Sequence, residues 1–386
     1  NKLFQIEIAS SRSETYSSES RSPSKVKFTS LKEDLKRRDF TINAMAMDID
    51  PESFGKIHDP FGGQNHLIEG LLKTPLDPMK TFSDDPLRMM RAAYFASKLN
   101  FKLDSDCRAA ITNQSDRISI VSWERIREEL IKTLSTSKPS VGLVIMQKTG
   151  LLKTVFPEID IMYDMNQSSE WHHKDIFAHT LQVVDNAAKL TDKMEIRFAA
   201  LVHDIAKPNT RRINKKKGYT FHGHDAVGER MISRVAFRLR LSKKIKSYLE
   251  KLTLLHLRPI SLVKEIVTDS AVRRLMIAAG DDLDDLMVLC RADITTKNSN
   301  KIKKYLNNFD KVEMKISKVS EKDNMKKFQS PIRGNEIMSL FKLKEGKQVG
   351  VIKKAIEEAI LEGIIENTYD DSYQYLLNKK DEFLNI

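Results

Sequence analysis

The stretch Asp84-Asp85-Pro86-Leu87-Arg88-Met89-Met90-Arg91 predicts the start of a helix with one charged face. A cap at Ser83 or Asp84, acidic residues in the first turn and a proline suited to that turn favour a helix that continues to Leu99. At about 100° per residue, Asp85, Arg88 and Arg91 spread over about a third of the circumference. Leu87, Met90 and Tyr94 lie roughly opposite and predict the buried face.

A carboxylate beside a guanidinium group can pair with the Watson–Crick edge of a nucleobase, because the two supply complementary lone pairs and hydrogens. Asp85 and Arg88 are therefore candidates for a pair that selects a base. The simpler interpretation is an i,i+3 salt bridge on an exposed helix, which contributes only about 0.2–0.5 kcal/mol. On the residues alone, the salt bridge is the favoured interpretation.

The segment from Arg37 to Ala46 places charges directly before small apolar residues. The guanidinium fork of Arg38 suits phosphate or ribose oxygens, and Asp39 and Asn43 can fix the sugar or the arginine itself. A solvated helix cap explains the same residues equally well. We expect a short helix from Asp39 and then a strand through Met45 to Ile49.

The N-terminal segment alternates apolar and polar residues at Phe4-Gln5-Ile6-Glu7-Ile8, which predicts a strand of a larger sheet. Residues 10–24 are rich in Ser, Arg and Glu and predict a mobile loop, since they have no face to bury. Because the sequence starts with Asn1 next to this strand and lacks an initiator Met, we expect a truncated N-terminus.

After about residue 80 the strand signals give way to helical spacing. Helices are expected over 84–99, 123–134, 175–190, 195–206, 302–319 and 349–364, with Pro208 ending the fourth. The predicted fold class is α+β and mainly α. We expect four parts, which are a partial head at 1–67, a helical neck at 68–150, a helical metal-binding domain at 151–298 and a basic helical tail at 299–386.

The 386 residues include 65 Lys and Arg against 53 Asp and Glu, a net charge of +12 that attracts a polyanion such as nucleic acid. A lysine-rich composition that only keeps the protein soluble explains this excess about equally well. Two cysteines are too few for a disulfide scaffold or a zinc-finger quartet. No apolar run approaches the ~20 residues of a membrane helix, so we expect a cytoplasmic protein without a membrane partner.

The segment from Glu195 to Pro208 predicts an apolar helix interrupted by the pair His203-Asp204. A carboxylate in such a setting is costly to bury unless it is paired or bound to a metal. Six of the nine histidines fall between residues 172 and 224. A single histidine is usually an ordinary core or surface residue, but a set of His and Asp residues on helices is a more specific sign of a metal site. The candidates are His179, His203, Asp204, His222, His224, His256 and Asp293.

Four motifs within the first 150 residues, RRDFTINAMAMD, DPFGG, DDPLRMMRA and ERIREEL, closely resemble those of class II tRNA nucleotidyltransferases and bacterial poly(A) polymerases in order and spacing. The resemblance implies a polymerase-β-like nucleotidyltransferase head that uses Mg²⁺, CTP and ATP, with tRNA as the partner. It implies that Arg38, Asp39 and Asn43 surround the ribose and phosphates. It also implies that Asp85 and Arg88 form a protein template that selects CTP and then ATP, and that Arg91 contacts the nucleotide.

Two departures from the family pattern bear on activity. Tyr94 stands where many relatives have an arginine, so we expect triphosphate contacts to be weaker or to come from elsewhere. The Asp-x-Asp pair that holds two catalytic metals in relatives does not precede the arginine motif; Asp48 and Asp50 follow it and are not taken as equivalent. Glu7, on the polar face of the predicted N-terminal strand, is a candidate for a further acidic group near the catalytic metals. Because two-metal phosphoryl transfer needs paired carboxylates, we expect no nucleotide addition by these 386 residues alone.

The His and Asp set resembles the HD phosphohydrolase superfamily. The resemblance implies that His179, His203, Asp204 and Asp293 bind Mg²⁺ or a transition metal such as Mn, Fe, Co or Ni. Water on such a metal could hydrolyse phosphomonoesters or 2′,3′-cyclic phosphates. His222, His224, His256 and Lys207 are expected as accessory ligands or phosphate contacts. Contacts with tRNA phosphates are expected from Arg211, Arg212, Lys215, Lys216, Lys217 and the lysines between 301 and 327.

The residues leave three alternatives to CCA addition. The first is a poly(A) polymerase of the same superfamily, which ATP-only polymerisation by the full-length protein would favour. The second is an HD phosphohydrolase with a vestigial head, which loss of phosphatase activity in a His203→Ala, Asp204→Ala variant would support. The third is an RNA-binding protein without catalysis.

Overall fold

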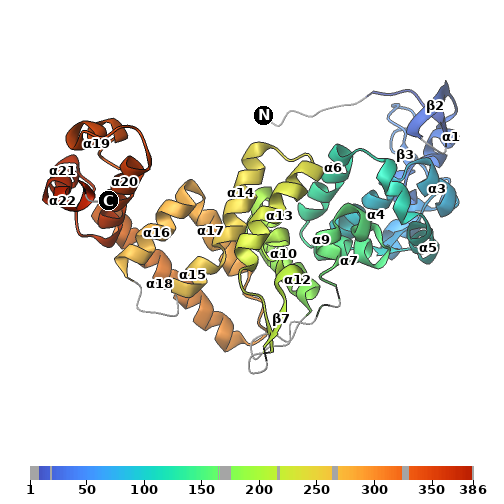
Figure 1. Cartoon of the computed structure of the whole chain (residues 1–386). Helices are drawn as coiled ribbons and strands as arrows, with labels where there is room; N and C mark the ends of the chain where they lie inside the picture. The colour runs from blue at the N-terminus through green and yellow to red at the C-terminus, as the bar shows by residue number, and fades with distance from the viewer. Residues whose placement is uncertain are drawn as a thin grey trace. The chain divides into compact units, whose positions relative to one another are not determined.

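The computed structural model describes residues 8–17, 20–163, 165, 175–214, 218–262, 268–323 and 330–384. The chain divides into two compact units, Asn1–Leu254 and Leu255–Ile386 (Figure 1). Helices dominate both units, and the described strands form small two-stranded sheets in the first. The predicted α+β, mainly α class is therefore confirmed. No described helix has the length and apolar character needed to cross a membrane.

The first unit holds most of the described elements. Its helices are α1 Leu31–Lys36, η1 Thr41–Asn43, α2 Gly63–Glu69, α3 Pro78–Asp84, α4 Leu87–Leu99, α5 Ser105–Gln114, η2 Ser115–Ile120, α6 Trp123–Leu134, α7 Ser140–Lys148, α8 Leu151–Val155, α9 Pro157–Asp160, α10 Ile176–Leu190, α11 Met194–Val202, α12 Lys207–Thr210, α13 His224–Arg238 and α14 Lys243–Leu255. The strand pairs are β1 Arg12–Ser17 with β2 Ser20–Phe28, β3 Ala46–Met47 with β4 Ile57–His58, β5 Leu71–Leu72 with β6 Lys102–Leu103, and β7 Arg212–Asn214 with β8 Gly218–Thr220.

Strands β6, β7 and β8 follow residue 80, so the expectation that strands end near that point is wrong. Each has only two or three residues, which is too short to show an alternating pattern. The β5–β6 pair is parallel, whereas the other three described pairs are antiparallel.

The polar stretch 10–24, predicted to be a mobile loop, instead forms most of the antiparallel hairpin β1–β2. The two strands satisfy each other's backbone N–H and C=O groups, so the hairpin needs no buried apolar face. Asp34 and Arg37, at the end of α1, anchor the hairpin through the backbone of Arg12. Oδ1 of Asp34 accepts from the backbone N of Arg12 at 3.1 Å, and Nε of Arg37 donates to the carbonyl oxygen of Arg12 at 2.8 Å. Of the strand predicted at 4–8, only Ile8 belongs to the described residues. Glu7 lies outside them.

The short helix expected from Asp39 and the strand that follows are present as η1 and β3, both shorter than predicted. Asp59 caps α2 by accepting from the backbone N of Gly63 at 2.7 Å. A Cβ on Gly63 would lie 2.4 Å from the carbonyl oxygen of Thr41, so only glycine lets α2 approach η1 this closely.

The helix predicted from Asp84 begins later than expected. Residues up to Asp84 belong to α3, and α4 starts at Leu87 after the cap Pro86. Helix α4 packs against α6 and α7, and a Cβ on Gly142 of α7 would lie 2.6 Å from the carbonyl oxygen of Ala93. This contact brings the backbones of α4 and α7 close together in the core.

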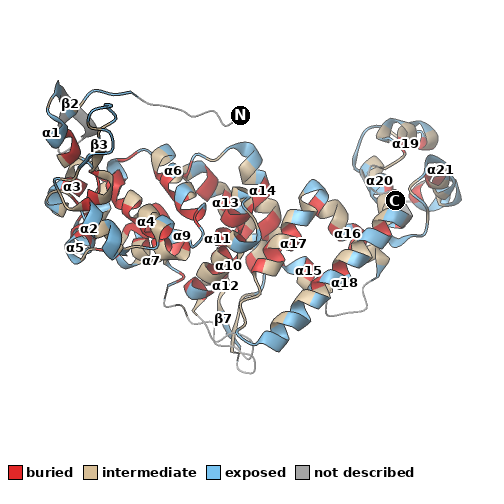
Figure 2. Ribbon diagram, turned by 180° about the vertical axis from the view of Figure 1, so that it is seen from behind, coloured by how far each residue is buried: buried red, intermediate tan, exposed pale blue. Residues whose placement is uncertain are grey.

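The helices predicted at 123–134 and 175–190 are confirmed as α6 and α10. The helix expected over 195–206 ends at Val202, and the chain turns through His203 and Asp204. Pro208 therefore does not end that helix but lies in the first turn of the short helix α12, where a missing N–H costs nothing. Figure 2 shows that buried residues lie on the inward faces of these helices.

The second unit is helical throughout its described part. Its elements are α15 Leu257–Leu262, α16 Asp269–Ala279, η3 Gly280–Asp282, α17 Leu283–Ala292, α18 Ser299–Asp323, α19 Gly334–Phe341, α20 Lys347–Glu362, α21 Tyr369–Asn378 and α22 Lys380–Leu384. Helices α18 and α20 confirm the two amphipathic helices predicted here. Ile337, Ile352 and Ile356 lie in a buried cluster formed by α19 to α22.

Candidate functional site

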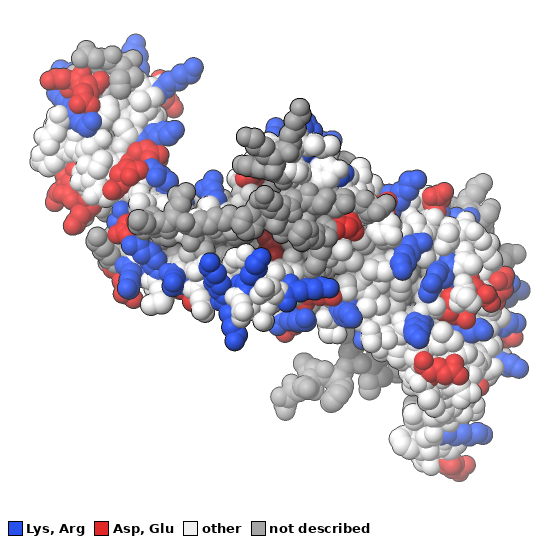
Figure 3. All heavy atoms as spheres, turned by 90° about the horizontal axis from the view of Figure 1, so that it is seen from below, with Lys and Arg blue, Asp and Glu red and all other residues white. Residues whose placement is uncertain are grey.

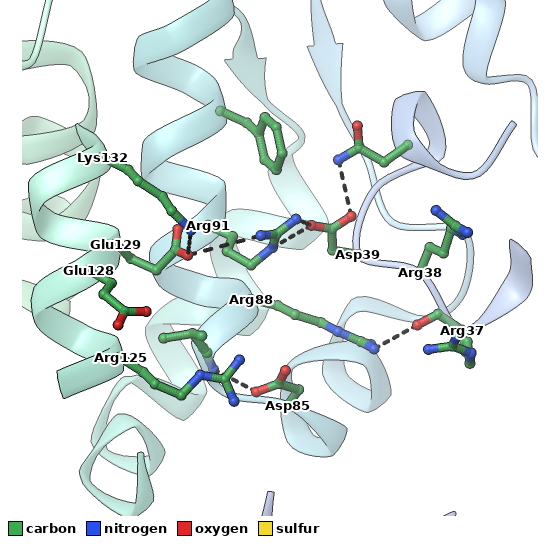
Figure 4. A pocket seen from close by; sticks show the side chains of 13 residues that line it. Arg37, Arg38, Asp39, Asp85, Arg88, Arg91, Arg125, Glu128, Glu129 and Lys132 are labelled. Carbon is green, nitrogen blue, oxygen red and sulfur yellow. Dashed lines mark hydrogen bonds and ion pairs between the residues drawn. The ribbon is translucent and has the colours of Figure 1, made fainter. Parts of the chain in front are cut away.

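A cavity of about 620 Å³ lies where the arginine-rich segment after α1 meets α4 and α6 (Figure 4). It is lined by Arg37, Arg38, Asp39, Asn43, Asp85, Leu87, Arg88, Arg91, Phe95, Arg125, Glu128, Glu129 and Lys132. Six of these side chains are basic and four are acidic, so the cavity suits an anionic ligand. The structure thus brings together all six residues predicted to surround a nucleotide, namely Arg38, Asp39, Asn43, Asp85, Arg88 and Arg91.

Arg91 of α4 is held by carboxylates from two other segments. Its Nε and Nη2 lie 2.7 and 2.6 Å from Oδ2 of Asp39, and its Nη1 lies 4.0 Å from Oε1 of Glu129. Oδ1 of Asp39 accepts from the backbone N of Phe40 at 2.9 Å and from Nδ2 of Asn43 at 3.1 Å. Both oxygens of Asp39 are therefore engaged within the protein, and of its two predicted roles this geometry favours fixing the arginine.

Asp85 lies in the extended link between α3 and α4, not on the helical face predicted for it. A residue before proline is disfavoured in the α region, and Asp85 has φ −139° and ψ 97°. Its Oδ1 accepts from the backbone N of Leu87 at 3.2 Å. Arg88 is 8% exposed and donates to the carbonyls of Thr81 at 3.3 Å and Arg37 at 2.6 Å. These bonds fix both side chains at the cavity wall, and Arg88 keeps further donors because a guanidinium has five.

The carboxylates of this cavity do not form the paired site that two catalytic metals need. Asp39 is bonded to Arg91 as described, and Oε1 of Glu129 accepts from Lys132 at 2.8 Å. Asp48 and Asp50 do not line the cavity. Oδ1 of Asp48 instead lies 2.8 Å from Nε2 of His58 in β4.

A second polar cluster lies in the helical core formed by α10 to α13. Asp204, in the turn after α11, is 1% exposed. The Nε2 atoms of His179 and His203 lie 3.3 and 3.1 Å from its Oδ2, and Nε2 of His224 lies 3.3 Å from its Oδ1. Nζ of Lys207 lies 2.6 Å from Oδ2. The structure thus brings together five of the residues predicted for the HD site.

Backbone carbonyls orient two of these imidazole rings. Nδ1 of His203 lies 2.9 Å from the oxygen of Ala200, and Nδ1 of His224 lies 2.6 Å from that of Phe221. A carbonyl only accepts, so each Nδ1 donates, and a neutral ring then has its lone pair on Nε2. Both lone pairs face the carboxylate of Asp204, which also only accepts. Such a set of acceptors requires a proton or a metal cation among them, and this donor set fits a divalent metal.

The carboxyl group of Asp204 is ionised in this environment. Burial by itself raises its pKa, but the charge of His203 in its protonated form, in which Nε2 carries a proton, and the charge of Lys207 outweigh burial, together with hydrogen bonds from His179 and His203. The pKa of Asp204 therefore lies well below its ordinary value of 3.8. An ionised carboxylate is the form that ligates a metal.

The remaining HD candidates are Asp293, His256 and His222. Asp293 caps the C-terminus of α17, and His256 lies between α14 and α15, both in the second unit. Within that unit, Sγ of Cys290 donates to the carbonyl oxygen of His256 at 3.1 Å. His222 is exposed in the turn before α13. Participation of these three residues in the metal site stays a prediction.

Three segments match known protein families. Residues 1–73 match the poly A polymerase head domain, residues 100–162 the probable RNA and SrmB-binding site of polymerase A, and residues 176–296 the HD domain. The chain belongs to the family of class II tRNA nucleotidyltransferases and bacterial poly(A) polymerases.

Curated members of this family include proteins named Multifunctional CCA protein. The one from Vibrio campbellii is 34% identical over 277 residues, which cover 68% of this chain and 64% of that protein. The one from Shewanella denitrificans is 36% identical over 218 residues, or 55% of this chain and 50% of that protein. The chain thus spans about 64% of the length of the first of these relatives.

Solved structures of family members share the fold. The Bacillus stearothermophilus CCA-adding enzyme in complex with CTP matches with a TM-score of 0.65 and 23% identity, covering 92% of this chain and 76% of that one. The Thermotoga maritima CCA-adding enzyme complexed with tRNA matches with a TM-score of 0.51 and 17% identity, covering 90% of this chain and 74% of that one. At these identities, the likeness shows the fold alone.

The family motif beginning at Glu124 contributes cavity residues to which the sequence analysis assigned no role. Arg125, Glu128, Glu129 and Lys132 of α6 line the cavity. The motif ERIREEL was the available signal, because its charged residues recur one helical turn apart. Tyr94 does not line the cavity, and its ring packs 5.0 Å from that of Phe95. The additional cations near the nucleotide candidates therefore come from α6 and Arg37 rather than from position 94.

Predicted tRNA contacts lie on two elements that are far apart in the sequence. Arg211 and Arg212 lie at the start of β7, whereas Lys215, Lys216 and Lys217 lie outside the described residues. On α18 the exposed lysines are Lys301, Lys303, Lys304, Lys311 and Lys318, while Lys315 pairs with Asp269 at 2.5 Å. Lys322, Lys326 and Lys327 have no described side chains. Figure 3 shows Lys and Arg side chains gathered at several places on one face of the molecule.

Proposed function

We propose that the whole protein is a tRNA nucleotidyltransferase that adds or repairs the 3′-terminal CCA of tRNA, using CTP and ATP. The observation that supports this function best is the cavity in which Asp85 and Arg88 lie with Arg38 and Arg91. It combines a carboxylate acceptor, guanidinium donors and an excess of basic groups, which are the features that a nucleoside triphosphate requires. A cytoplasmic protein with tRNA as its partner follows from this proposal.

The pair Asp85 and Arg88 has the chemistry to select cytosine and adenine together. Both bases present an exocyclic amino donor beside an unprotonated ring nitrogen. Asp85 would accept from the amino group while Arg88 donates to the ring nitrogen. Uracil and guanine present a carbonyl and a ring N–H at those places, so the carboxylate would face another acceptor. One well-formed base contact discriminates by about 1–3 kcal/mol, which is about fivefold to 150-fold in affinity.

The test is the equilibrium binding of CTP, ATP, UTP and GTP to the 386-residue chain carrying Asp85→Asn. An amide keeps an oxygen for the backbone N of Leu87 but places a donor where the second carboxylate oxygen lies. We expect the preference for CTP and ATP to fall by at least about fivefold. The matched control is Asp84→Asn, because Asp84 is the neighbouring carboxylate and does not line the cavity. Burial raises the pKa of Asp84 above its ordinary value. An unchanged preference in Asp85→Asn would contradict the template.

Catalysis is tested on the whole protein. Incubation with tRNA transcripts that lack CCA should show incorporation of CMP and then AMP. Polymerisation of ATP without use of CTP would favour the poly(A) polymerase instead.

We also propose that the cluster around Asp204 binds Mg²⁺ or a divalent transition metal, with His179, His203 and Asp293 as the further ligands. The metal would supply an acidified water for the hydrolysis of phosphate esters. In this centre His203 and His224 present oriented Nε2 atoms, and Lys207 supplies a positive charge for a phosphate.

Calorimetric titration with Mn²⁺ or Ni²⁺ tests the metal site without relying on turnover. We expect one bound ion per chain, and loss of that binding in Asp204→Asn. Asp225→Asn is the control, because Asp225 lies next to His224 in α13 but outside the cluster. Equal metal binding by the wild type and Asp204→Asn would contradict the site. Hydrolysis of bis-p-nitrophenyl phosphate then measures whether the bound metal is active.

A further inference from the structure

The hairpin β7–β8 is joined to the histidine–aspartate cluster at both of its ends. It follows α12, where Lys207 has its Nζ 2.6 Å from Oδ2 of Asp204. On the other side, β8 leads into Phe221, whose carbonyl oxygen accepts from Nδ1 of His224. Nζ of Lys207 also lies 5.7 Å from the centroid of the Phe221 ring. Figure 1 shows the hairpin projecting away from the helices at this place. The base of the hairpin therefore lies beside Lys207 at one side of the cluster.

An arginine and a tyrosine are stacked at the base of this hairpin. The guanidinium carbon of Arg211 lies 3.7 Å from the centroid of the Tyr219 ring, a close cation–π contact. Tyr219 is two residues before Phe221, which corresponds to about 7 Å in an extended chain. The stack thus lies close enough to Lys207 and Phe221 for adjoining groups of one ligand to contact both places.

Within the described residues, the arginines at the base of the hairpin have little compensation from acidic groups. From Ile205 to His224 the sequence contains six basic residues and no acidic residue. Within the described part of the chain, neither Arg211 nor Arg212 is in an ion pair; the guanidinium of Arg212 donates to the carbonyl of Arg211 at 2.9 Å. Ile213 is 77% exposed. A basic surface with an aromatic ring and an exposed apolar side chain suits single-stranded RNA, whose bases stack on such rings while its phosphates meet the cations.

We propose that the hairpin β7–β8 is a specificity element of the histidine–aspartate centre. The Arg211–Tyr219 stack binds the nucleobase next to the phosphate held at Lys207, so that the centre selects the end of an RNA chain over a phosphate ester without a base. This inference rests on the proposed phosphohydrolase, and it assigns to that site an RNA terminus as its substrate class. Tyr219 acts as a binding residue for the base and takes no part in the hydrolysis.

The test is the binding of a short fluorescein-labelled oligoribonucleotide that ends in a hydrolysis-resistant 3′-phosphorothioate, measured by fluorescence anisotropy on the 386-residue chain. We expect Tyr219→Ala to raise Kd at least about fivefold, the lower limit for one stacked base. Tyr219→Phe keeps the ring and should restore binding to within about twofold of the wild type. Tyr369→Ala is the control, because this exposed tyrosine lies in the second unit.

A second oligonucleotide, abasic at its 3′-terminal position, separates base stacking from a general change in the hairpin. The wild type and Tyr219→Ala should bind it equally, because the group that the ring contacts is missing. An equal loss on both oligonucleotides, or no loss on either, would overturn the proposal. If the wild type hydrolyses no phosphate ester with any divalent metal, the phosphohydrolase proposal fails, and these binding results still decide whether the hairpin recognises RNA.

Discussion

The contact between Asp39 and Arg91 offers a sharp test of how the nucleotide cavity is held together. Asp39→Asn removes a negative charge while it preserves the shape of the side chain. Arg91 then loses the acceptor that lies 2.7 Å from its Nε and 2.6 Å from its Nη2. The hydrogen bond from Asn43 can persist, because an amide oxygen also accepts.

The magnitude follows from the burial of the two partners. Removing one partner of a fully buried ion pair costs about 3–5 kcal/mol, because the other charge stays buried. Asp39 is nearly buried, but the side chain of Arg91 is 31% exposed and has Glu129 as a second carboxylate at 4.0 Å. Solvent and Glu129 therefore compensate part of the loss. We expect Asp39→Asn to lower the free energy of unfolding of the first unit by about 1–2 kcal/mol.

Urea unfolding followed by tryptophan fluorescence measures this loss, because Trp123 lies in α6 of the first unit. The midpoint should fall while the slope of free energy against urea stays constant. Asp50→Asn is the matched control, since Asp50 is exposed and accepts from the backbone N of Glu52. A loss smaller than about 0.5 kcal/mol, the range of ordinary surface substitutions, would refute the argument that Asp39 holds Arg91 in place.

Three further predictions concern the hairpin anchor, helix packing and RNA binding. Burial raises the pKa of Asp34, but the hydrogen bond from the backbone N of Arg12 and the neighbouring guanidinium groups outweigh it, so the folded pKa lies below the ordinary 3.8. The anchor is therefore intact above about pH 4 and is lost as the pH falls through the lowered pKa of folded Asp34. Backbone hydrogen exchange in the hairpin should become faster over this pH range in the wild type. In the Asp34→Asn variant, which has no carboxylate to protonate, the exchange should show no such change with pH. Gly142→Ala should destabilise the protein by about 1–3 kcal/mol in thermal or urea unfolding, because its Cβ would lie 2.6 Å from the carbonyl of Ala93. Gly350→Ala, where a Cβ meets nothing within 4 Å in α20, should instead stabilise it by about 0.5–1 kcal/mol. Binding of tRNA should weaken steeply with salt, and a plot of log K against log salt concentration with no slope would contradict phosphate contacts.

Helical elements with clear start signals were predicted well because their signals are local. Helix α6 has the predicted bounds, and α10 begins one residue after Asp175, which caps it. The boundary between α3 and α4 was misplaced, because two helices meet at Pro86 and the acidic pair before it fits either the end of one or the start of the other. The hairpin β1–β2 was missed because its strands are polar and its anchor lies on a different element, at Asp34.

The residue types of the two sites were visible in the sequence, since Asp85 and Arg88 stand in one motif and His203 and Asp204 are adjacent. Their partners were less visible. Glu129 follows Arg91 by 38 positions, yet the two side chains are 4.0 Å apart. The packing of α4 against α6 decides this contact, and no local pattern specifies it.

The sequence by itself determined the family, the helical class and the kinds of side chain that recognise nucleotides and metals, because these depend on short motifs and on the periodicity of apolar residues. Only the tertiary structure decided that Asp39 fixes Arg91 and that His179 and His224 both meet Asp204. These facts depend on distances between segments that are remote along the chain, and such distances follow from how the helices pack together.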